Sequence, residues 1–251
     1  MSKDKHTQFS NLGYSDFKEM AKDLSLSKYE KIGFPDSYRE GREGFIFDDI
    51  KSKLPPLASE KKVIFDIGPG CSDLPFMLID HCRLQGHKLL LSDSEDMLNL
   101  LPDETFLEKY PGIYPNDFSN FEKLKGKVDT ILVYSVIQYI FSEGNIHNFL
   151  DKTLSLLAPG GHLLIGDIPN ISKRKRFFSS DTGIEFHQNY TKKNELPEIE
   201  HFNIEFNTID DAVLFSLLFR ARSQGFDAYI LPQNNMLPMS NRREDILIVR
   251  P

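Results

Sequence analysis

Short apolar runs alternate with segments of helical periodicity along most of the chain. Runs of four to six residues that are rich in valine, isoleucine or leucine and bounded by turn residues are typical of buried strands. Four such runs lie at 63–67, 88–93, 130–134 and 162–166. Apolar residues three or four positions apart predict helices at 74–83, 145–157 and 210–224. The alternation predicts an α/β protein with a doubly wound, mostly parallel sheet.

Two segments fall outside this alternation. Residues 1–60 precede the first strand and hold helical patterns at 16–26 and 43–54, so we expect an N-terminal helical cap there. Residues 61–251 then form the core. Residues 170–208 make an unusually long connection after the fifth strand, because ordinary loops of this kind run about 2–6 residues. A connection of this length predicts a lid or a substrate-binding insertion.

The composition limits the possible partners. A net charge of −7 over 251 residues disfavours a nucleic-acid face, which needs a basic footprint. Two cysteines at 71 and 82 form neither a disulfide framework nor a metal-binding pattern. The chain has no apolar run near 18 residues and no signal-peptide pattern, so we expect a cytoplasmic protein that does not enter a membrane. We find no ligand spacing that requires a metal.

A glycine turn follows the first predicted strand. Asp66 lies near the end of that strand, and Gly68-Pro69-Gly70 leads into a helix that begins after Ser72. A dinucleotide-binding loop would carry a third glycine where Asp73 stands, and a carboxylate there would repel a pyrophosphate. A phosphate-binding P-loop would need Gly-Lys-Ser or Gly-Lys-Thr, which is absent. The turn therefore argues against NAD or FAD and is not a P-loop. Its alternative reading is an ordinary glycine turn in another α/β protein.

This turn resembles motif I of the class I S-adenosylmethionine (SAM) methyltransferases, an acid followed by G-x-G-x-G. Asp66, Gly68 and Gly70 match, whereas Ser72 replaces the last glycine. The segment 157–165, L-A-P-G-G-H-L-L-I, is similar to the pattern that precedes the fifth strand in that family. The resemblance covers about residues 60–170 and the C-terminal tail. It implies a seven-stranded sheet of order 3-2-1-4-5-7-6 with the last strand antiparallel.

The resemblance also implies SAM as the cofactor and S-adenosylhomocysteine (SAH) as its product. Asp93 ends the second strand, where its carboxylate can accept both ribose hydroxyls; its alternative role is a helix N-cap. Asp117 and Phe118 follow a weak third strand, expected at 112–114, as adenine contacts or as a simple turn. The expected cofactor-binding residues are Asp66, Gly68, Pro69, Gly70, Asp93, Ser94, Met97, Asp117, Phe118, Tyr134 and Ser135.

The acceptor is expected beside the end of the fourth strand. The segment 134–139 lacks both the Asp/Asn-Pro-Pro-Tyr/Phe of amino-methylating DNA enzymes and the Pro-Cys of cytosine-C5 enzymes, and it resembles small-molecule methyltransferases. Gln138 and Tyr139 are the acceptor-orienting candidates. His187 and Asp167 are candidate general bases. Each of these four residues has an ordinary structural role as its alternative.

Basic and aromatic residues of the cap and the long connection predict an anionic acceptor. The expected substrate-binding residues are Tyr29, Tyr38, Arg39, Asn170, Lys173, Arg174 and Arg176. Their alternative role is a solvated surface. The chain also resembles bacterial methyltransferases of surface-polysaccharide and nucleotide-sugar pathways. This resemblance implies O-methylation of a nucleotide-activated sugar or of a phosphoryl- or phosphoramidate-linked saccharide precursor. An RNA or protein methyltransferase, or a non-catalytic SAM-binding scaffold, is the alternative function, and the oligomeric state stays open.

Overall fold

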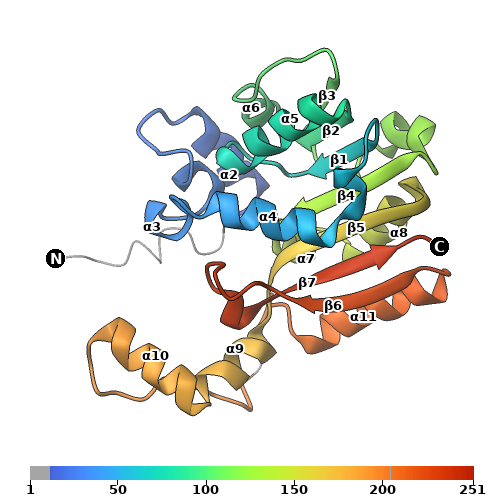
Figure 1. Cartoon of the computed structure of the whole chain (residues 1–251). Coiled ribbons are helices and arrows are strands. Elements are labelled where there is room, and N and C mark those ends of the chain that lie inside the picture. The colour runs from blue at the N-terminus through green and yellow to red at the C-terminus, as the bar shows by residue number, and fades with distance from the viewer. Residues whose placement is uncertain (1–11, 204) are drawn as a thin grey trace.

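A seven-stranded sheet forms the centre of the computed structural model, which describes residues 12–203 and 205–251 (Figure 1). The strand order is β3-β2-β1-β4-β5-β7-β6. Strands β1 to β5 pair in parallel, whereas β7 runs antiparallel to both β5 and β6. The predicted fold is therefore confirmed. The strands are β1 (Val63–Ile67), β2 (Lys88–Asp93), β3 (Leu107–Pro111), β4 (Val128–Tyr134), β5 (Leu157–Pro169), β6 (Asp227–Pro232) and β7 (Arg243–Val249).

The position predicted for the third strand is wrong. Strand β3 ends at Pro111, and residues 112–114 belong to the loop beyond it. The sequence of β3 gives little signal because it is an edge strand with polar side chains. Glu108 forms an ion pair with Lys88 of β2 at 2.5 Å and accepts a hydrogen bond from the Tyr110 hydroxyl at 2.6 Å.

Strand β5 begins five residues earlier than predicted. Leu157 already pairs with Val128 of β4, and the ladder resumes where His162 pairs with Thr130, so the intervening residues form an irregular bulge. A Cβ on Gly161 would lie 2.9 Å from the Val128 carbonyl oxygen. Glycine is required there because the two backbones approach too closely for any side chain.

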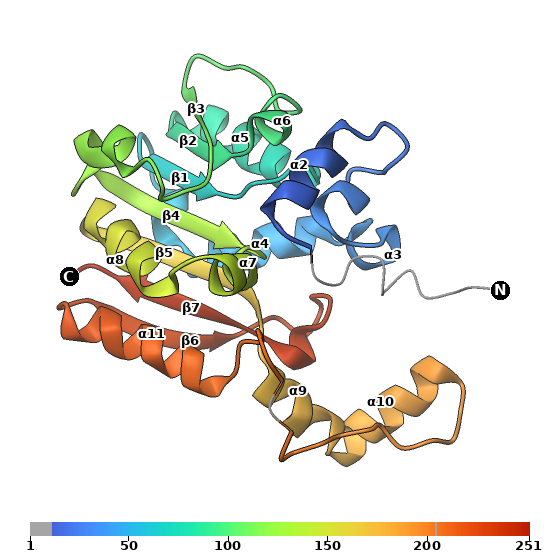
Figure 2. The same ribbon diagram turned by 180° about the vertical axis from the view of Figure 1, so that it is seen from behind.

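Helices cover both faces of the sheet (Figures 1 and 2). One face packs against α4 (Glu43–Lys53) and α5 (Asp73–Gln85), and the other against α8 (Ile146–Leu156) and α11 (Asp211–Ser223). In β1 the side chains alternate between the two layers, Ile64 facing the first and Phe65 the second. Both are fully buried, and a side chain of this size contributes about 1.5–3 kcal/mol on burial. The two layers hold the strand ends, and hence the site, in place.

The described part of the predicted N-terminal cap divides into two. Helix α2 (Tyr14–Lys22), the short η1 (Glu30–Ile32) and α3 (Asp36–Arg39) lie beyond the carboxyl ends of the strands (Figure 2). Helix α4 belongs to a core layer, and η2 (Pro55–Ala58) leads from it into β1. Helix α2 stops earlier than predicted because Asp23 caps a turn by accepting from the Ser25 amide. We call residues 12–42 the cap; residues 1–11 of the predicted cap lie outside the described part.

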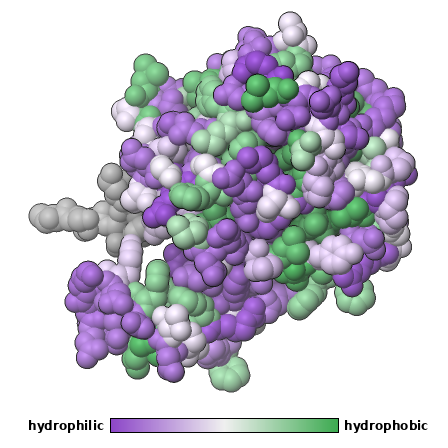
Figure 3. Space-filling view, in the orientation of Figure 1, coloured by the Kyte–Doolittle hydropathy of each residue, from purple (hydrophilic) through white to green (hydrophobic). Residues whose placement is uncertain are grey.

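The long connection after β5 forms an arm, residues 171–203, which projects from the body (Figures 1 and 2). It contains α9 (Ile171–Phe178) and α10 (Asp181–Thr191), and η4 (Ser240–Arg242) packs on α9. Polar and apolar side chains share the surface of the arm, where Phe186 and Leu196 are exposed (Figure 3). Across the described residues, no helix is both long and apolar enough to span a membrane.

Candidate active site

The glycine turn after β1 forms one wall of a cavity. Gly68 and Gly70 have φ angles of +74° and +65°, which side-chain-bearing residues rarely adopt. A Cβ on Gly68 would lie 2.6 Å from Val136 Cγ2, and one on Gly70 would lie 2.6 Å from Ile32 Cγ2. The turn therefore needs glycine both for its backbone conformation and for the space around it.

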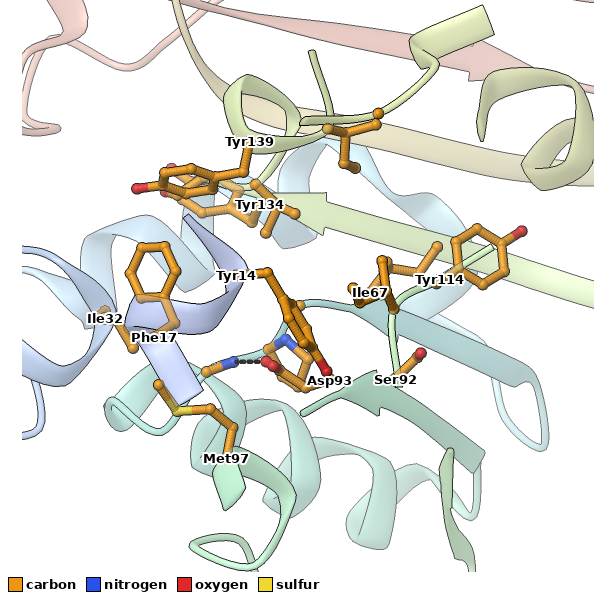
Figure 4. Close-up of a pocket in the computed structure, with 18 of the residues that line it drawn as sticks. Tyr14, Phe17, Ile32, Ile67, Ser92, Asp93, Met97, Tyr114, Tyr134 and Tyr139 are labelled. Atoms are coloured by element: carbon orange, nitrogen blue, oxygen red, sulfur yellow. Dashed lines mark hydrogen bonds between the residues drawn. The ribbon is translucent and has the colours of Figure 1, made fainter. Parts of the chain in front are cut away.

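Asp93 faces this turn from the end of β2. One carboxylate oxygen accepts a hydrogen bond from the Gly70 amide at 3.1 Å (Figure 4). The other accepts from the Ser94 amide at 2.6 Å. Each carboxylate oxygen has a second acceptor direction, so Asp93 can still accept from ligand hydroxyls. The helix N-cap beside it is Ser94, whose hydroxyl accepts from the Met97 amide at 3.2 Å. Asp93 itself does not cap that helix, and Ser94 supports the wall without lining the cavity.

Two carboxyl groups lie close together behind the turn. Burial raises the pKa of Asp66 to about 8, and the nearby charge of Asp93 adds to that shift. Burial also raises the pKa of Asp93 to about 6, although its two backbone hydrogen bonds oppose the shift. At neutral pH Asp66 is therefore mainly neutral and Asp93 mainly ionised. The ionised carboxylate that this wall presents to the cavity is therefore that of Asp93, whereas Asp66 is buried and does not line the cavity.

A carboxylate of α4 caps the helix that follows the glycine turn. Ser72 occupies the N-cap position of α5 without making a side-chain cap. Instead, the Leu74 amide donates to Glu43 at 2.5 Å. Glu43 is 2% exposed, its other oxygen has no hydrogen-bond partner among the described residues, and burial raises the pKa of its carboxyl. Helix α4 thereby fixes the start of α5 and the end of the turn.

The cavity lies at the carboxyl ends of β1, β2 and β4 and has a volume of about 390 Å³. This volume falls within the usual range for small-ligand sites. Most of its wall is aromatic or aliphatic, and Arg39, Asp93 and Glu143 are the charged residues that line it within the described chain. Its labelled lining in Figure 4 includes Tyr14, Phe17, Ile32, Ile67, Ser92, Met97, Tyr114, Tyr134 and Tyr139.

The cap supplies side chains that the sequence did not indicate. Tyr14 and Phe17 of α2 and Ile32 of η1 face the glycine turn across the cavity (Figure 4). The Tyr14 amide donates to Glu143 at 3.2 Å, which ties α2 to the end of α7 (Ile137–Glu143). The many aromatic residues of the cap indicated that it could line a site. Hydrophobic periodicity does not show which face of the cap packs toward the sheet.

Arg39 joins the cap to the strand ends. It is 4% exposed, donates to the Ser135 hydroxyl at 2.6 Å and to Asp167 at 3.3 Å, and lies over the Phe34 ring at 4.2 Å. Ser135 in turn donates to Asp167. Arg39 lines the cavity, but its charge is already engaged by Asp167.

Asp167 does not match the predicted role of general base. It lies outside the main cavity, at the end of β5, between Arg39 and Arg243, and the Arg243 guanidinium approaches it to 2.9 Å. Its carboxylate is already engaged by these two guanidinium groups and does not face the cavity. This correction makes Asp167 a structural anchor.

His187 also lies away from the cavity. It is on α10 of the arm, where its ring packs edge-on against Phe178 at 6.3 Å. Helix α10 packs mainly on α9 and not on the strand ends. The expectation that His187 is a general base is corrected, because its side chain does not reach the cavity.

The loop after β3 contributes different residues from those predicted. Gly112 to Asn116 line the cavity, whereas Asp117 and Phe118 do not. Asp117 is exposed, and Phe118 is buried in the core among aromatic neighbours, including Phe121 and Tyr114. The residues predicted to contact the adenine lie a few positions too far along the chain, because β3 ends at Pro111 and its exit loop starts earlier than expected.

The end of β4 agrees in part with the prediction. Tyr134, Ser135 and Tyr139 line the cavity, but Gln138 does not. The Gln138 amide nitrogen donates to the Ser135 carbonyl at 2.8 Å and so supports the turn after β4. Tyr139 packs edge-on against Phe17 of the cap at 4.8 Å, and burial raises the pKa of its hydroxyl.

The remaining substrate-binding predictions lie outside the cavity. The Tyr29 hydroxyl donates to Asp73 at 2.9 Å, and Lys173 donates to the Arg243 carbonyl at 2.7 Å. Arg176 is paired with Asp211. Asn170 is 1% exposed and caps α9 by accepting from the Ser172 amide at 2.9 Å. These four residues hold the structure together, and Tyr38 and Arg174 lie where the cap and the arm meet.

No group of three or more histidine, cysteine or acidic side chains within the described parts of the chain is arranged to hold a metal ion.

Comparisons with known proteins report on the fold. No family model matches the sequence, and no curated protein matches it. Among solved structures, the chain is similar to the N-methyltransferase NodS from Bradyrhizobium japonicum WM9 in complex with SAH. The TM-score is 0.57 at 11% identity, covering 95% of this chain and 98% of NodS.

Two further structures show the same likeness. The plantazolicin methyltransferase BpumL, in complex with a triazolic desmethylPZN analog and SAH, gives a TM-score of 0.55 at 14% identity, covering 94% of this chain and 99% of that one. The CurJ carbon methyltransferase gives a TM-score of 0.56 at 14% identity. The match covers 94% of this chain and 64% of the CurJ chain. These likenesses show the fold, which the chain shares with the three methyltransferase structures.

Proposed function

We propose that the protein is a SAM-dependent methyltransferase acting on a small polar molecule. One observation carries this proposal: the glycine turn after β1 and the carboxylate of Asp93 at the end of β2 are hydrogen-bonded to each other and line one cavity, at the point where the strand order reverses. Open α/β sheets bind their ligands at this reversal point. The fold shared with NodS and BpumL, both solved with SAH, supports the choice of SAM.

The residues present suit a sulfonium nucleoside. Asp93 provides acceptors for the two ribose hydroxyls, and Met97 and Tyr14 provide apolar surface beside it. The backbone at Gly68 and Gly70 is bare, so a ligand can approach it closely. The negative charge of Asp93 also favours a positively charged ligand.

The acceptor belongs at the other end of the cavity. Tyr134, Ser135 and Tyr139 line that end from β4 and α7, and Phe17 and Phe34 cover it from the cap. The bound cofactor supplies a methyl group on a positively charged sulfur. The protein aligns the acceptor with that methyl group and excludes water, and positioning of this kind can lower the barrier by several kcal/mol.

We further propose that the acceptor atom is a hydroxyl oxygen on a molecule with an anionic group, such as a nucleotide-activated sugar. The cavity itself offers no free cation within the described residues, because Arg39 is engaged by Asp167. An anionic group must therefore lie outside the cavity, beyond Tyr139 and Phe34. A hydroxyl acceptor loses its proton during transfer, and we propose the Glu143 carboxylate, which lines the cavity, as the group that accepts it.

Methyl transfer from isotopically labelled SAM to a panel of hydroxylated small molecules, RNA and protein tests this function. We expect labelled product from at least one nucleotide-sugar or sugar-phosphate acceptor and none from RNA or protein. Tyr139→Ala should reduce transfer and leave SAH affinity within about threefold, because Tyr139 lies at the acceptor end. Binding of SAH without transfer to any acceptor of the panel would favour a non-catalytic SAM-binding protein.

A further inference from the structure

Most cations of the arm have partners. The Lys173 ammonium donates to a carbonyl, Lys175 lies 3.3 Å from Glu205, and Arg176 pairs with Asp211. Arg174 differs, since its guanidinium forms no ion pair within the described chain and lies over the Phe178 ring at 5.6 Å. Among the cations of α9, Arg174 is therefore the one without a partner in the described chain.

A second cation without a carboxylate partner approaches the same ring. Arg242 of η4 is half-buried, lies over Phe178 at 5.8 Å, and has no ion pair among the residues described. Burial lowers the pKa of its guanidinium, and the neighbouring charges of Arg243 and Arg174 lower it further. Partly buried like charges are costly unless a counterion offsets them.

Two tyrosine hydroxyls lie beside these arginines. Burial and a hydrogen bond with Tyr190 of α10 raise the pKa of Tyr38 of α3. Both tyrosines are close enough to Arg242 to affect its titration. Here the far end of the arm meets the cap, and four donor side chains converge from four separate elements: α3, α9, α10 and η4.

The backbone that carries the arginines is held firmly. The backbone N–H of Asn170 donates to the backbone carbonyl of Arg242 at 3.1 Å. The Asn170 side chain donates to Asp211 at 2.7 Å and to Glu244 at 2.5 Å. Helix α9 and η4 therefore keep a fixed spacing, as a preorganised binding site requires.

This cluster lies next to the acceptor end of the cavity. The residue after Arg242 is Arg243, whose guanidinium lies over the Phe34 ring at 5.8 Å. Phe34 lines the cavity, and the charge of Arg243 acts on Tyr139, which also lines it. A molecule whose acceptor atom lies near Tyr139 can extend past Phe34 toward Arg242.

We propose that Arg174 and Arg242, with the hydroxyls of Tyr38 and Tyr190, bind the phosphoryl group of the acceptor at the junction of arm and cap. The role of this site in methyl transfer rests on the proposed function. The site itself is inferred from the two arginines without ion-pair partners in the described chain. Guanidinium groups bind phosphoryl oxygens through paired N–H donors, and phenol hydroxyls can donate to the same oxygens. The junction thereby selects phosphorylated acceptors.

Calorimetric titration of the full-length protein with pyrophosphate, at fixed low ionic strength, tests the site. The test variant is the double substitution Arg174→Gln and Arg242→Gln. Its matched control is Arg83→Gln and Arg220→Gln, which removes the same charge from two exposed, carboxylate-paired arginines elsewhere. SAH titration of all three proteins reports separately on the cofactor site and on folding.

We expect saturable pyrophosphate binding to the wild type and to the control, and a dissociation constant at least about tenfold higher for the test variant. SAH affinity should be equal in all three proteins. The proposal is overturned if the wild type does not bind pyrophosphate, or if the test variant and the control bind it equally. Pyrophosphate binding without SAH binding would leave the anion site standing and remove the methyltransferase assignment.

Discussion

The two ends of the binding region differ in how their parts are brought together. At the cofactor end, the glycine turn and Asp93 belong to neighbouring parallel strands, β1 and β2, whose carboxyl ends must meet. At the arm end, Tyr38, Arg174 and Arg242 come from segments far apart in the chain. The first end follows from the topology of the sheet alone, whereas the second depends on where the cap and the arm pack.

The difference also appears in the charges. The cofactor end presents the ionised Asp93 and no cation, and the arm end presents Arg174 and Arg242 without carboxylate partners in the described structure. Arg39 lies between them and is engaged by Asp167. A cationic cofactor and an anionic acceptor would thus be attracted to opposite ends, which orients the two reactants.

The largest effect is expected at the boundary between these ends. Arg39→Met should lower the free energy of unfolding by about 3–5 kcal/mol, because Asp167 and Glu43 lose a buried cation. Lys51→Met removes an exposed pair with Asp48 and should cost less than about 1 kcal/mol. Urea denaturation of the two variants measures the difference. Equal destabilisation would show that Arg39 does not hold the cap to the strand ends.

A substitution in the glycine turn should act on the cofactor end alone. Gly68→Ala places a Cβ 2.6 Å from Val136 Cγ2 in a left-handed backbone, so we expect SAH affinity to fall about a hundredfold. Gly160→Ala imposes similar backbone strain, at φ +73°, where no atom lies within 4 Å of the added Cβ. It should leave SAH affinity unchanged. A Gly68→Ala protein that is folded and binds SAH normally would contradict this geometry.

The buried Asp66 should give the cofactor end a pH signature. Burial raises its pKa in the folded state from 3.8 to about 8. Between these values the folded state binds a proton that the unfolded state lacks, so stability falls as pH rises through this window. One such proton lowers the free energy of unfolding by up to about 1.4 kcal/mol for each unit by which the pH rises.

Asp66→Asn removes this proton and should flatten the decline of stability between about pH 4 and 8 relative to the wild type. Urea denaturation at several pH values measures the two slopes. The comparison must be between slopes, since Glu43 and Asp245 also have raised pKa values through burial and persist in both proteins. Parallel slopes would show that Asp66 is ionised in the folded protein.

The smallest effect is expected on the arm. His187→Ala should change SAH affinity less than about twofold and the free energy of unfolding by less than about 0.5 kcal/mol, because His187 lies away from the cavity. Calorimetry and urea denaturation check these values. A loss of SAH binding would mean that the arm closes over the cofactor end in solution, contrary to the arrangement described.

Strands β1 and β2 and the glycine turn were predictable because their signals are local, whereas the strand order was implied only by the resemblance to the class I methyltransferases. Residues 63–67 form β1 and 88–93 form β2 as the apolar runs indicated. Asp117 was predicted to line the site because the edge strand β3 is polar, lacks such an apolar run and was therefore expected too far along the chain. Asp167 and His187 were misjudged for a different reason. Their partners, Arg243 and Phe178, are set by tertiary packing that no periodicity along the chain encodes.

The central claim is that the cavity binds SAM through the Gly70 turn and Asp93. Calorimetric titration of SAH into the wild type and into Asp93→Ala measures this most directly. We expect one molecule bound per chain in the wild type and an affinity at least about tenfold lower in the variant, because the ribose loses its acceptor. A folded wild-type protein that binds neither SAH nor SAM, or a variant that binds SAH as tightly as the wild type, would contradict the account.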